Sequence, residues 1–242
     1  MTAKPPSGER LVFTAPKRTV VPILGTDRLF PVHRIYCVGQ NYAAHAREMG
    51  ASDRERPFFF AKPHDAVCCA NRVPYPAMTE KLHHEVELVV ALGKGGRNLE
   101  ADNALSLVLG YAVGVDLTRR DLQEISKQKG RPWTTAKGFD CSAPLSAIRE
   151  LPGAALPASA EISLTVNGEH RQKATLEEMI WSVPEILSEL SRYFELKAGD
   201  LVFTGTPAGV GPVRPGDPRM CRIEGGAELA FGMEGATYLP PR

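Results

Sequence analysis

The chain has 242 residues, of which 29 are lysine or arginine and 28 are aspartate or glutamate, so its formal net charge is +1. That balance excludes a broad basic surface of the kind that tracks nucleic-acid phosphates. No stretch approaches the ~20 uninterrupted apolar residues of a membrane helix, and the N-terminal residues carry no apolar signal-peptide core. We therefore expect a cytoplasmic protein with no nucleic-acid or membrane partner.

The 22 glycines and 20 prolines favour many turns and short strands over a helix bundle. The five cysteines are odd in number and include no C-x-x-C pair. We interpret them as free thiols in a reducing compartment rather than as a zinc site.

The expected elements run as follows in chain order. Residues 1–32 are polar and rich in proline, and we expect an N-terminal arm or short leading strands there. Residues 33–242 are expected to form one main domain. Its apolar runs, bounded by glycine or proline, predict strands at 35–38, 57–61, 85–92, 111–117 and 200–204, and hairpins at 161–173 and 219–233. Capping and terminating residues predict helices at 42–49, 101–107, 119–129 and 184–194. Strands dominate, so the predicted fold class is α+β and β-rich.

Three carboxylates carry the strongest chemical signal. Glu85 and Glu87 are two residues apart in an apolar strand, so their side chains share one face, with Cα atoms about 7 Å apart. Like charges on such a strand repel each other and raise the pKa of the pair unless a cation lies between them. Asp116, which follows the apolar strand residues 113–115, would supply a third oxygen ligand for a hard divalent ion. The alternative is a set of solvated acidic residues at an exposed strand edge.

Other side chains each have more than one interpretation. His45 and Glu48, at i and i+3, share one helix face, and the glutamate could orient the imidazole as a base for water. They could equally be a surface pair. Lys137 lies in a predicted loop of aromatic and small residues, either as a surface lysine or as a stabiliser of an enolate beside a metal. His83 and His84 could be metal ligands, supports for the ligands, or core residues.

The glycine-rich loop at residues 204–211 could present backbone N–H groups to an anion. It lacks the Lys-Ser/Thr ending of a nucleotide-binding P-loop, so nucleotide binding is disfavoured. A carboxylate-binding turn and a structural turn both remain open.

Seven segments stand in a fixed order along the chain: 36–45 (YCVGQNYAAH), 60–63 (FAKP), 83–88 (HHEVEL), 114–118 (GVDLT), 129–133 (KGRPW), 136–140 (AKGFD) and 199–207 (GDLVFTGTP). In this order, over roughly residues 34–235, they resemble the fumarylacetoacetate hydrolase family, in particular its short acylpyruvase and fumarylpyruvate hydrolase type. Each segment alone is a weak signal, and the ordered set is a strong one.

This resemblance implies a mixed β-sandwich roll of the family's C-terminal domain type with a few short helices, and a homodimer. It implies Mg²⁺ or Mn²⁺, replaceable by Ca²⁺ in a crystal, held by Glu85, Glu87 and Asp116. It also implies a lid carrying His45 and Glu48. The family's lysine falls on Lys137, and the resemblance implies substrate contacts from Gln40, Tyr42, Lys62, Gln123, Gly205 and Thr206. Gln40 stands where many relatives carry arginine, so one fixed charge near the substrate is missing.

The expected function is that of a metal-dependent hydrolase. It would cleave a carbon–carbon bond in a 2,4-dioxo acid, an acylpyruvate and most favourably fumarylpyruvate, to pyruvate plus fumarate, in the gentisate route of aromatic catabolism. His45 with Glu48 would activate water, and Lys137 would stabilise the departing enolate. The alternatives are an oxaloacetate decarboxylase or a 2-hydroxydienoate isomerase or tautomerase using the same metal site, and, less favoured, a non-catalytic dicarboxylate-binding protein.

Overall fold

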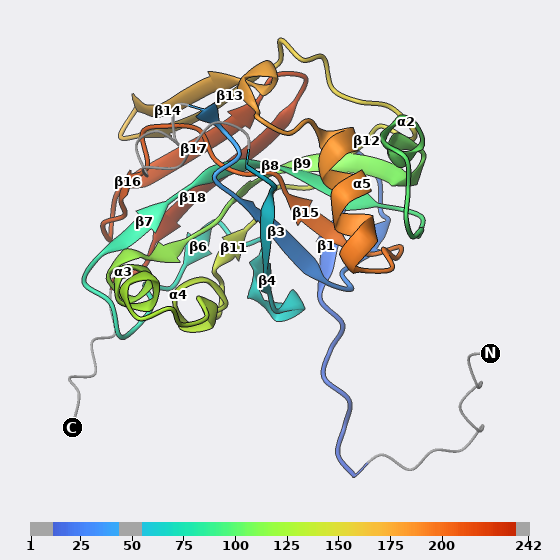
Figure 1. Cartoon of the computed structure of the whole chain (residues 1–242). Helices are drawn as coiled ribbons and strands as arrows, with labels where there is room; N and C mark the ends of the chain where they lie inside the picture. Colours follow the sequence, from blue (N-terminus) through green and yellow to red (C-terminus); the bar gives the residue numbers. More distant parts are fainter. Residues whose placement is uncertain (1–11, 44–54, 236–242) are drawn as a thin grey trace.

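A mixed six-stranded sheet forms the centre of the computed structural model, which describes residues 12–43 and 55–235 (Figure 1). Its strands, in spatial order, are β12 (Arg149–Glu150), β9 (Val108–Val115), β8 (Val86–Leu92), β15 (Leu201–Phe203), β3 (Ile35–Gly39) and β4 (Phe58–Lys62). The sheet is mixed because β15 pairs parallel with β3 and antiparallel with β8.

A five-stranded sheet packs against one face of the central sheet, with contacts from β13, β17 and β18 onto β8 and β9. Its spatial order is β14 (Glu169–Thr175), β13 (Glu161–Val166), β17 (Pro218–Ile223), β18 (Ala227–Met233) and β6 (Arg72–Val73). Smaller sheets pair β1 (Val20–Pro22) with β2 (Leu29–Pro31), β11 (Ala143–Pro144) with β5 (Val67–Cys68), and β7 (Leu82–His84) with both β10 (Thr118–Arg119) and β16 (Gly211–Pro212).

The helices are short and lie at the edges of the sheets. In Figure 1, α3 and α4 lie side by side at one end, and α2 contacts α5 at another. At the start of α5, the Ser182 backbone N–H and hydroxyl both donate to Glu185, so that Ser182 and Glu185 form a capping box. Pro184 lies in the first turn of the helix. The helical segments are α2 (Ala101–Ala104), α3 (Arg120–Gln128), α4 (Thr134–Lys137) and α5 (Val183–Tyr193), with 3₁₀ turns at His64–Ala66, Leu105–Leu107 and Leu176–Glu178.

Both faces of the central sheet are buried, which explains the nearly continuous apolar run of β8. Leu88 and Val90 pack in the cluster between the two large sheets. Val89 and Ala91 point the other way, into a second cluster that includes the leading hairpin β1–β2. Because strand side chains alternate between faces, Glu87 belongs to the face of Val89 and Ala91.

The predicted β-rich fold is confirmed, with strands or hairpins in each predicted range. Two details differ. β9 begins at Val108 rather than Tyr111. Lys137, expected in a loop, ends the single-turn helix α4, a length too short for any hydrophobic period to reveal. The predicted helix at 42–49 falls mostly outside the described residues. Within the described ranges, no helix has the length and apolar character needed to cross a membrane.

Candidate active site

Three buried carboxylates converge where the chain passes from one sheet to another. Glu85 lies in the one-residue break between β7 and β8, and Asp116 directly follows β9. The antiparallel register pairs Val86 with Val115, and the Asp116 N–H donates to the Glu85 carbonyl at 2.8 Å. One oxygen from each of Glu85, Glu87 and Asp116 lies within 4.8 Å of the others. The three residues are at most 6% exposed, so they are not solvated acids at a strand edge.

Buried cations surround this carboxylate cluster. Lys137 Nζ lies 2.7 Å from Glu85 Oε2 and 2.5 Å from Asp116 Oδ2. Lys62 Nζ lies 2.7 Å from Asp116 Oδ1, and Arg120 Nη2 pairs with Glu85 Oε1. Buried charges need such partners, because an unpaired one costs several kcal/mol. Arg120 was missed by the sequence analysis, since nothing in a charged helix marks which arginine turns inward.

The donor set fits a hard divalent cation. Glu87 accepts a hydrogen bond from the Gly205 N–H at 2.7 Å and has no cationic partner among the described residues. Burial, followed by the charges of Asp116 and Glu85, holds the pKa of the Glu87 carboxyl well above its ordinary value. Asp116 Oδ1 pairs with Lys62 by distance but accepts no hydrogen bond from the described residues. Clustered carboxylate oxygens with unused acceptor capacity are what Mg²⁺ and Mn²⁺ bind.

A small cavity opens above the carboxylates. Its wall is partly aromatic: the Trp133 ring makes an edge contact with Phe58 at 5.4 Å between centroids and lies 5.8 Å from Phe60. The described residues that line it are Val38, Gly39, Gln40, Phe58, Phe60, Glu85, Glu87, Asp116, Arg120, Gln123, Lys127, Trp133, Lys137 and Thr206. The cavity therefore joins an ionic floor to an apolar wall.

Gln172 supports the carboxylate strand from behind. Its Oε1 accepts from the Val86 N–H at 3.0 Å, and its Nε2 donates to the Thr206 hydroxyl at 2.8 Å. That hydroxyl donates in turn to the Val86 carbonyl at 2.9 Å. The backbone N–H of the residue between Glu85 and Glu87 is thus held by Gln172, which is 1% exposed, and its carbonyl by the Thr206 hydroxyl that Gln172 orients. The sequence showed no sign of Gln172, which lies on a hairpin strand of otherwise mostly exposed residues.

His84 completes this network and predicts a pH dependence. Its Nδ1 contacts Gln172 Oε1 at 3.0 Å, so Nδ1 carries the proton. Burial lowers the pKa of His84 from 6.5 to about 4. Between these values the unfolded chain binds a proton that the native protein does not, so the free energy of unfolding should fall by about 3 kcal/mol as the pH drops through this window.

Urea unfolding at several pH values between 7 and about 4 measures this loss. The matched variant His84→Asn keeps an N–H donor beside Gln172 but cannot titrate. It should show a shallower pH dependence than the parent protein, and parallel curves for the two would contradict the role given to His84.

The remaining predicted site residues are distributed as follows. Gln40 and Gln123 line the cavity, and Gln123 is hydrogen-bonded by Arg120. Lys62 lies behind Asp116, outside the set of described residues that line the cavity. Tyr42 is buried, its pKa is raised by burial and by Glu87, and its hydroxyl has no hydrogen-bond partner among the described residues.

The glycine-rich loop uses its polar groups within the protein. The Gly205 N–H is taken by Glu87 and the Thr206 hydroxyl by Val86. Gly205 has φ +97°, and a Cβ there would lie 2.6 Å from the Asn41 Cβ, so the loop requires glycine at this position. His45 and Glu48 lie outside the described residues.

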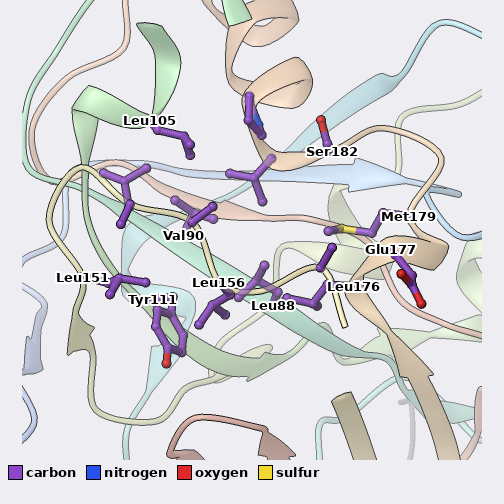
Figure 2. Close-up of a pocket in the computed structure, with 16 residues that line it drawn as sticks. Leu88, Val90, Leu105, Tyr111, Leu151, Leu156, Leu176, Glu177, Met179 and Ser182 are labelled. Carbon is purple, nitrogen blue, oxygen red and sulfur yellow. The ribbon is translucent and has the colours of Figure 1, made fainter. Parts of the chain in front are cut away.

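A second, larger cavity lies on the opposite face of the central sheet (Figure 2). Leu88 and Val90 of β8 point into it, together with Tyr111, Leu151 and Leu156. Because Glu87 lies between Leu88 and Val86 in the strand, its side chain points to the other face. This apolar cavity is therefore separate from the carboxylate cluster.

The fold and the cluster define a class: a metal-dependent enzyme built on a mixed β-sandwich roll. Residues 34–239 match the family model described as fumarylacetoacetate (FAA) hydrolase C-terminal. The chain belongs to the fumarylacetoacetate hydrolase family, and its buried carboxylate cluster fits a divalent ion such as Mg²⁺ or Mn²⁺.

Relatives and solved structures extend this result. The chain is 44% identical over 178 residues to a fumarylpyruvate hydrolase of Ralstonia, covering 73% of this chain and 92% of the relative. It is 42% identical over 200 residues to an oxaloacetate tautomerase of Escherichia coli, covering 81% and 90%. The crystal structure of fumarylpyruvate hydrolase from Pseudomonas aeruginosa in complex with Mn²⁺ and pyruvate superposes with a TM-score of 0.90 and 48% identity, covering 93% of this chain and 99% of that one.

Proposed function

We propose that the protein hydrolyses a carbon–carbon bond in a 2,4-dioxo acid, with fumarylpyruvate as the favoured substrate and pyruvate and fumarate as products. The observation that carries the proposal is the group of buried carboxylates within 4.8 Å, set among cations at the floor of a cavity. The similarity to two fumarylpyruvate hydrolases supports the choice of substrate.

In this proposal Glu85, Glu87 and Asp116 hold the divalent ion. When bound, the ion supplies Lewis-acid polarisation of the substrate's oxo acid group. Gln172 keeps the two glutamates in position, because it fixes the backbone of the residue between them. The carboxylates thus work as a rigid, prearranged set.

Lys137 stabilises the enolate that leaves when the bond breaks. Burial alone lowers the pKa of Lys137, but the carboxylates of Asp116 and Glu85 outweigh it and raise the pKa above its ordinary value. The side chain therefore stays a cation across the working pH range. A buried, fully charged ammonium is suited to offset negative charge that develops on an oxygen.

His45 is the proposed general base. With Glu48 orienting the imidazole, it would take a proton from the water that attacks the 4-carbonyl of the substrate. The attack forms a tetrahedral adduct, and its collapse breaks the bond to the pyruvate unit. Gln40, Gln123 and Thr206, which line the cavity, are the proposed substrate contacts. The contacts predicted for Tyr42, Lys62 and Gly205 are not part of this proposal, because these residues lie outside the described lining.

A second candidate is oxaloacetate tautomerisation or decarboxylation at the same ion. Its specific support is the 42% identity to an oxaloacetate tautomerase. These reactions need the chelating floor but no attacking water, so they would not depend on a water-activating base in the same way. A non-catalytic dicarboxylate-binding role is less favoured, because the chain keeps all three carboxylates, Lys137 and the His45–Glu48 pair.

A substrate panel tests the choice. Fumarylpyruvate, acetylpyruvate and oxaloacetate are each offered to the protein with Mg²⁺, and with EDTA as the control. We expect loss of the dioxo acid ultraviolet absorbance and release of pyruvate from fumarylpyruvate, abolished by EDTA. Tautomerisation or decarboxylation of oxaloacetate with no cleavage of either acylpyruvate would reject the hydrolase proposal and favour the second candidate. A homodimer, a cytoplasmic location and a place in gentisate catabolism stay predictions.

A further inference from the structure

Three polar side chains of α3 form a row that leads away from the carboxylates. Arg120, Gln123 and Lys127 stand at i, i+3 and i+7, which places them on one face of the helix. All three line the cavity above the carboxylates. Arg120 pairs with Glu85 at the floor, whereas Lys127 lies about 10 Å further along the helix axis. The row therefore spans the cavity from its ionic floor to its mouth.

The wall beside this row is apolar. Phe58, Phe60 and Trp133 line the same cavity. The Phe58 ring lies directly over Gly39, where a Cβ would come within 2.0 Å of the ring. Any side chain at that position would displace the ring. Aromatic rings thus form the wall of the cavity that carries Arg120 at its floor and the exposed Lys127 at its other end.

Lys127 has the properties of a free anion contact. Its Nζ lies 5.3 Å from the centroid of the Trp133 ring, and no carboxylate of the described ranges forms an ion pair with it. Burial, and next the neighbouring charge of Arg120, lower the pKa of Lys127. The charges of Glu85 and Glu124 act in the opposite direction, and a bound carboxylate would add to their effect by favouring the charged ammonium.

We propose that Lys127, held over the Trp133 ring, binds the distal carboxylate of the substrate and gives the enzyme its preference for dicarboxylates over monocarboxylates of equal length. The inference rests on the proposed function for the identity of the substrate. It adds a residue that selects substrates by the distance between their two carboxylates. A four-carbon dicarboxylate such as oxaloacetate, seated on the carboxylate floor, would not reach the mouth.

A matched pair of uncleavable ligands tests the subsite without turnover. Isothermal titration with Mg²⁺ present compares 2-oxoheptanedioate with 2-oxoheptanoate, which differ in the distal carboxylate alone. The protein should bind the dicarboxylate more tightly by about tenfold or more, the effect of one charge-assisted hydrogen bond. Lys127→Met should remove this preference, and Lys127→Arg should retain much of it.

Kinetics provides the second readout and the control. Lys127→Met should raise KM for fumarylpyruvate with little change in kcat, and should leave acetylpyruvate unaffected. Lys129→Met removes the same charge from an exposed position at the end of the same helix and should change neither substrate. An equal effect of the two lysine variants, or equal binding of both ligands by the parent protein, would overturn the inference. Failure of fumarylpyruvate cleavage together with a Lys127-dependent ligand preference would reject the proposed function and keep the subsite.

Discussion

Glu87→Gln should reduce kcat by about 10³-fold or more and abolish the stabilisation of the protein by Mg²⁺. The change removes one proposed ligand charge, and a lost Lewis-acid contact is expected to cost several kcal/mol of transition-state stabilisation. In the parent protein, Mg²⁺ at about 100 times its Kd should add ~2.7 kcal/mol to the free energy of unfolding. For a chain of this size that corresponds to a rise in Tm of about 5–10 °C.

Glu87 is the best ligand to change because its removal leaves no cation unpaired. Its partner is the Gly205 N–H, which the amide oxygen of glutamine can still accept from. The raised pKa of Glu87 also indicates that a neutral group suits this position when the metal is absent. We therefore expect the metal-free variant to be at least as stable as the metal-free parent.

Glu169→Gln, at a surface ion pair with Arg171, is the control and should change neither activity nor the Mg²⁺ response. A normal Mg²⁺-dependent rise in Tm for Glu87→Gln would contradict the proposed ligand set. Retained activity would contradict it as well.

His45→Ala should lower kcat for hydrolysis by about 10²–10⁴-fold, the usual contribution of a general base. Its effect on metal binding should be small, because the proposed base is not one of the ligands. The combination of lost turnover with an intact Mg²⁺-dependent rise in Tm separates water activation from loss of the metal site. Stopped assays of pyruvate release and thermal unfolding measure the two quantities on the same preparation.

The matched control is His170→Ala, which removes an exposed histidine of the β14 strand. It should leave kcat unchanged. If His45→Ala keeps near-normal hydrolysis, the base must be sought elsewhere. If it instead loses the Mg²⁺ response, the histidine contributes to the metal site and the proposed role is wrong.

The sequence was informative where the chemistry follows from local spacing. Glu85 and Glu87 are two residues apart in the predicted strand, and this spacing predicts a shared face, although the structure leaves Glu85 in a one-residue break before β8. Asp116 is the expected third ligand because it follows the next apolar strand. The register that brings Asp116 opposite Glu85 is a long-range property of two paired strands, and β-sheet register is set by packing that a single sequence does not display.

Residues that act from a distance were harder to predict. Gln172 lies on a hairpin about 85 positions away in the chain from the carboxylate strand. It contacts the Val86 N–H directly and also hydrogen-bonds the Thr206 hydroxyl. Arg120 and Lys127 belong to a helix whose charges resemble those of any solvated face. Their role in the site can be recognised only from the structure, because it shows that the helix face carrying positions i, i+3 and i+7 borders the cavity.

The most direct test of the central claim is an anomalous difference map from crystals of the protein grown or soaked with Mn²⁺. The account predicts one strong peak at coordinating distance from oxygens of Glu85, Glu87 and Asp116, about 2.0–2.4 Å away. A map with no peak among these side chains at saturating Mn²⁺, or with Mn²⁺ bound elsewhere while Lys137 still bridges Glu85 and Asp116, would contradict it.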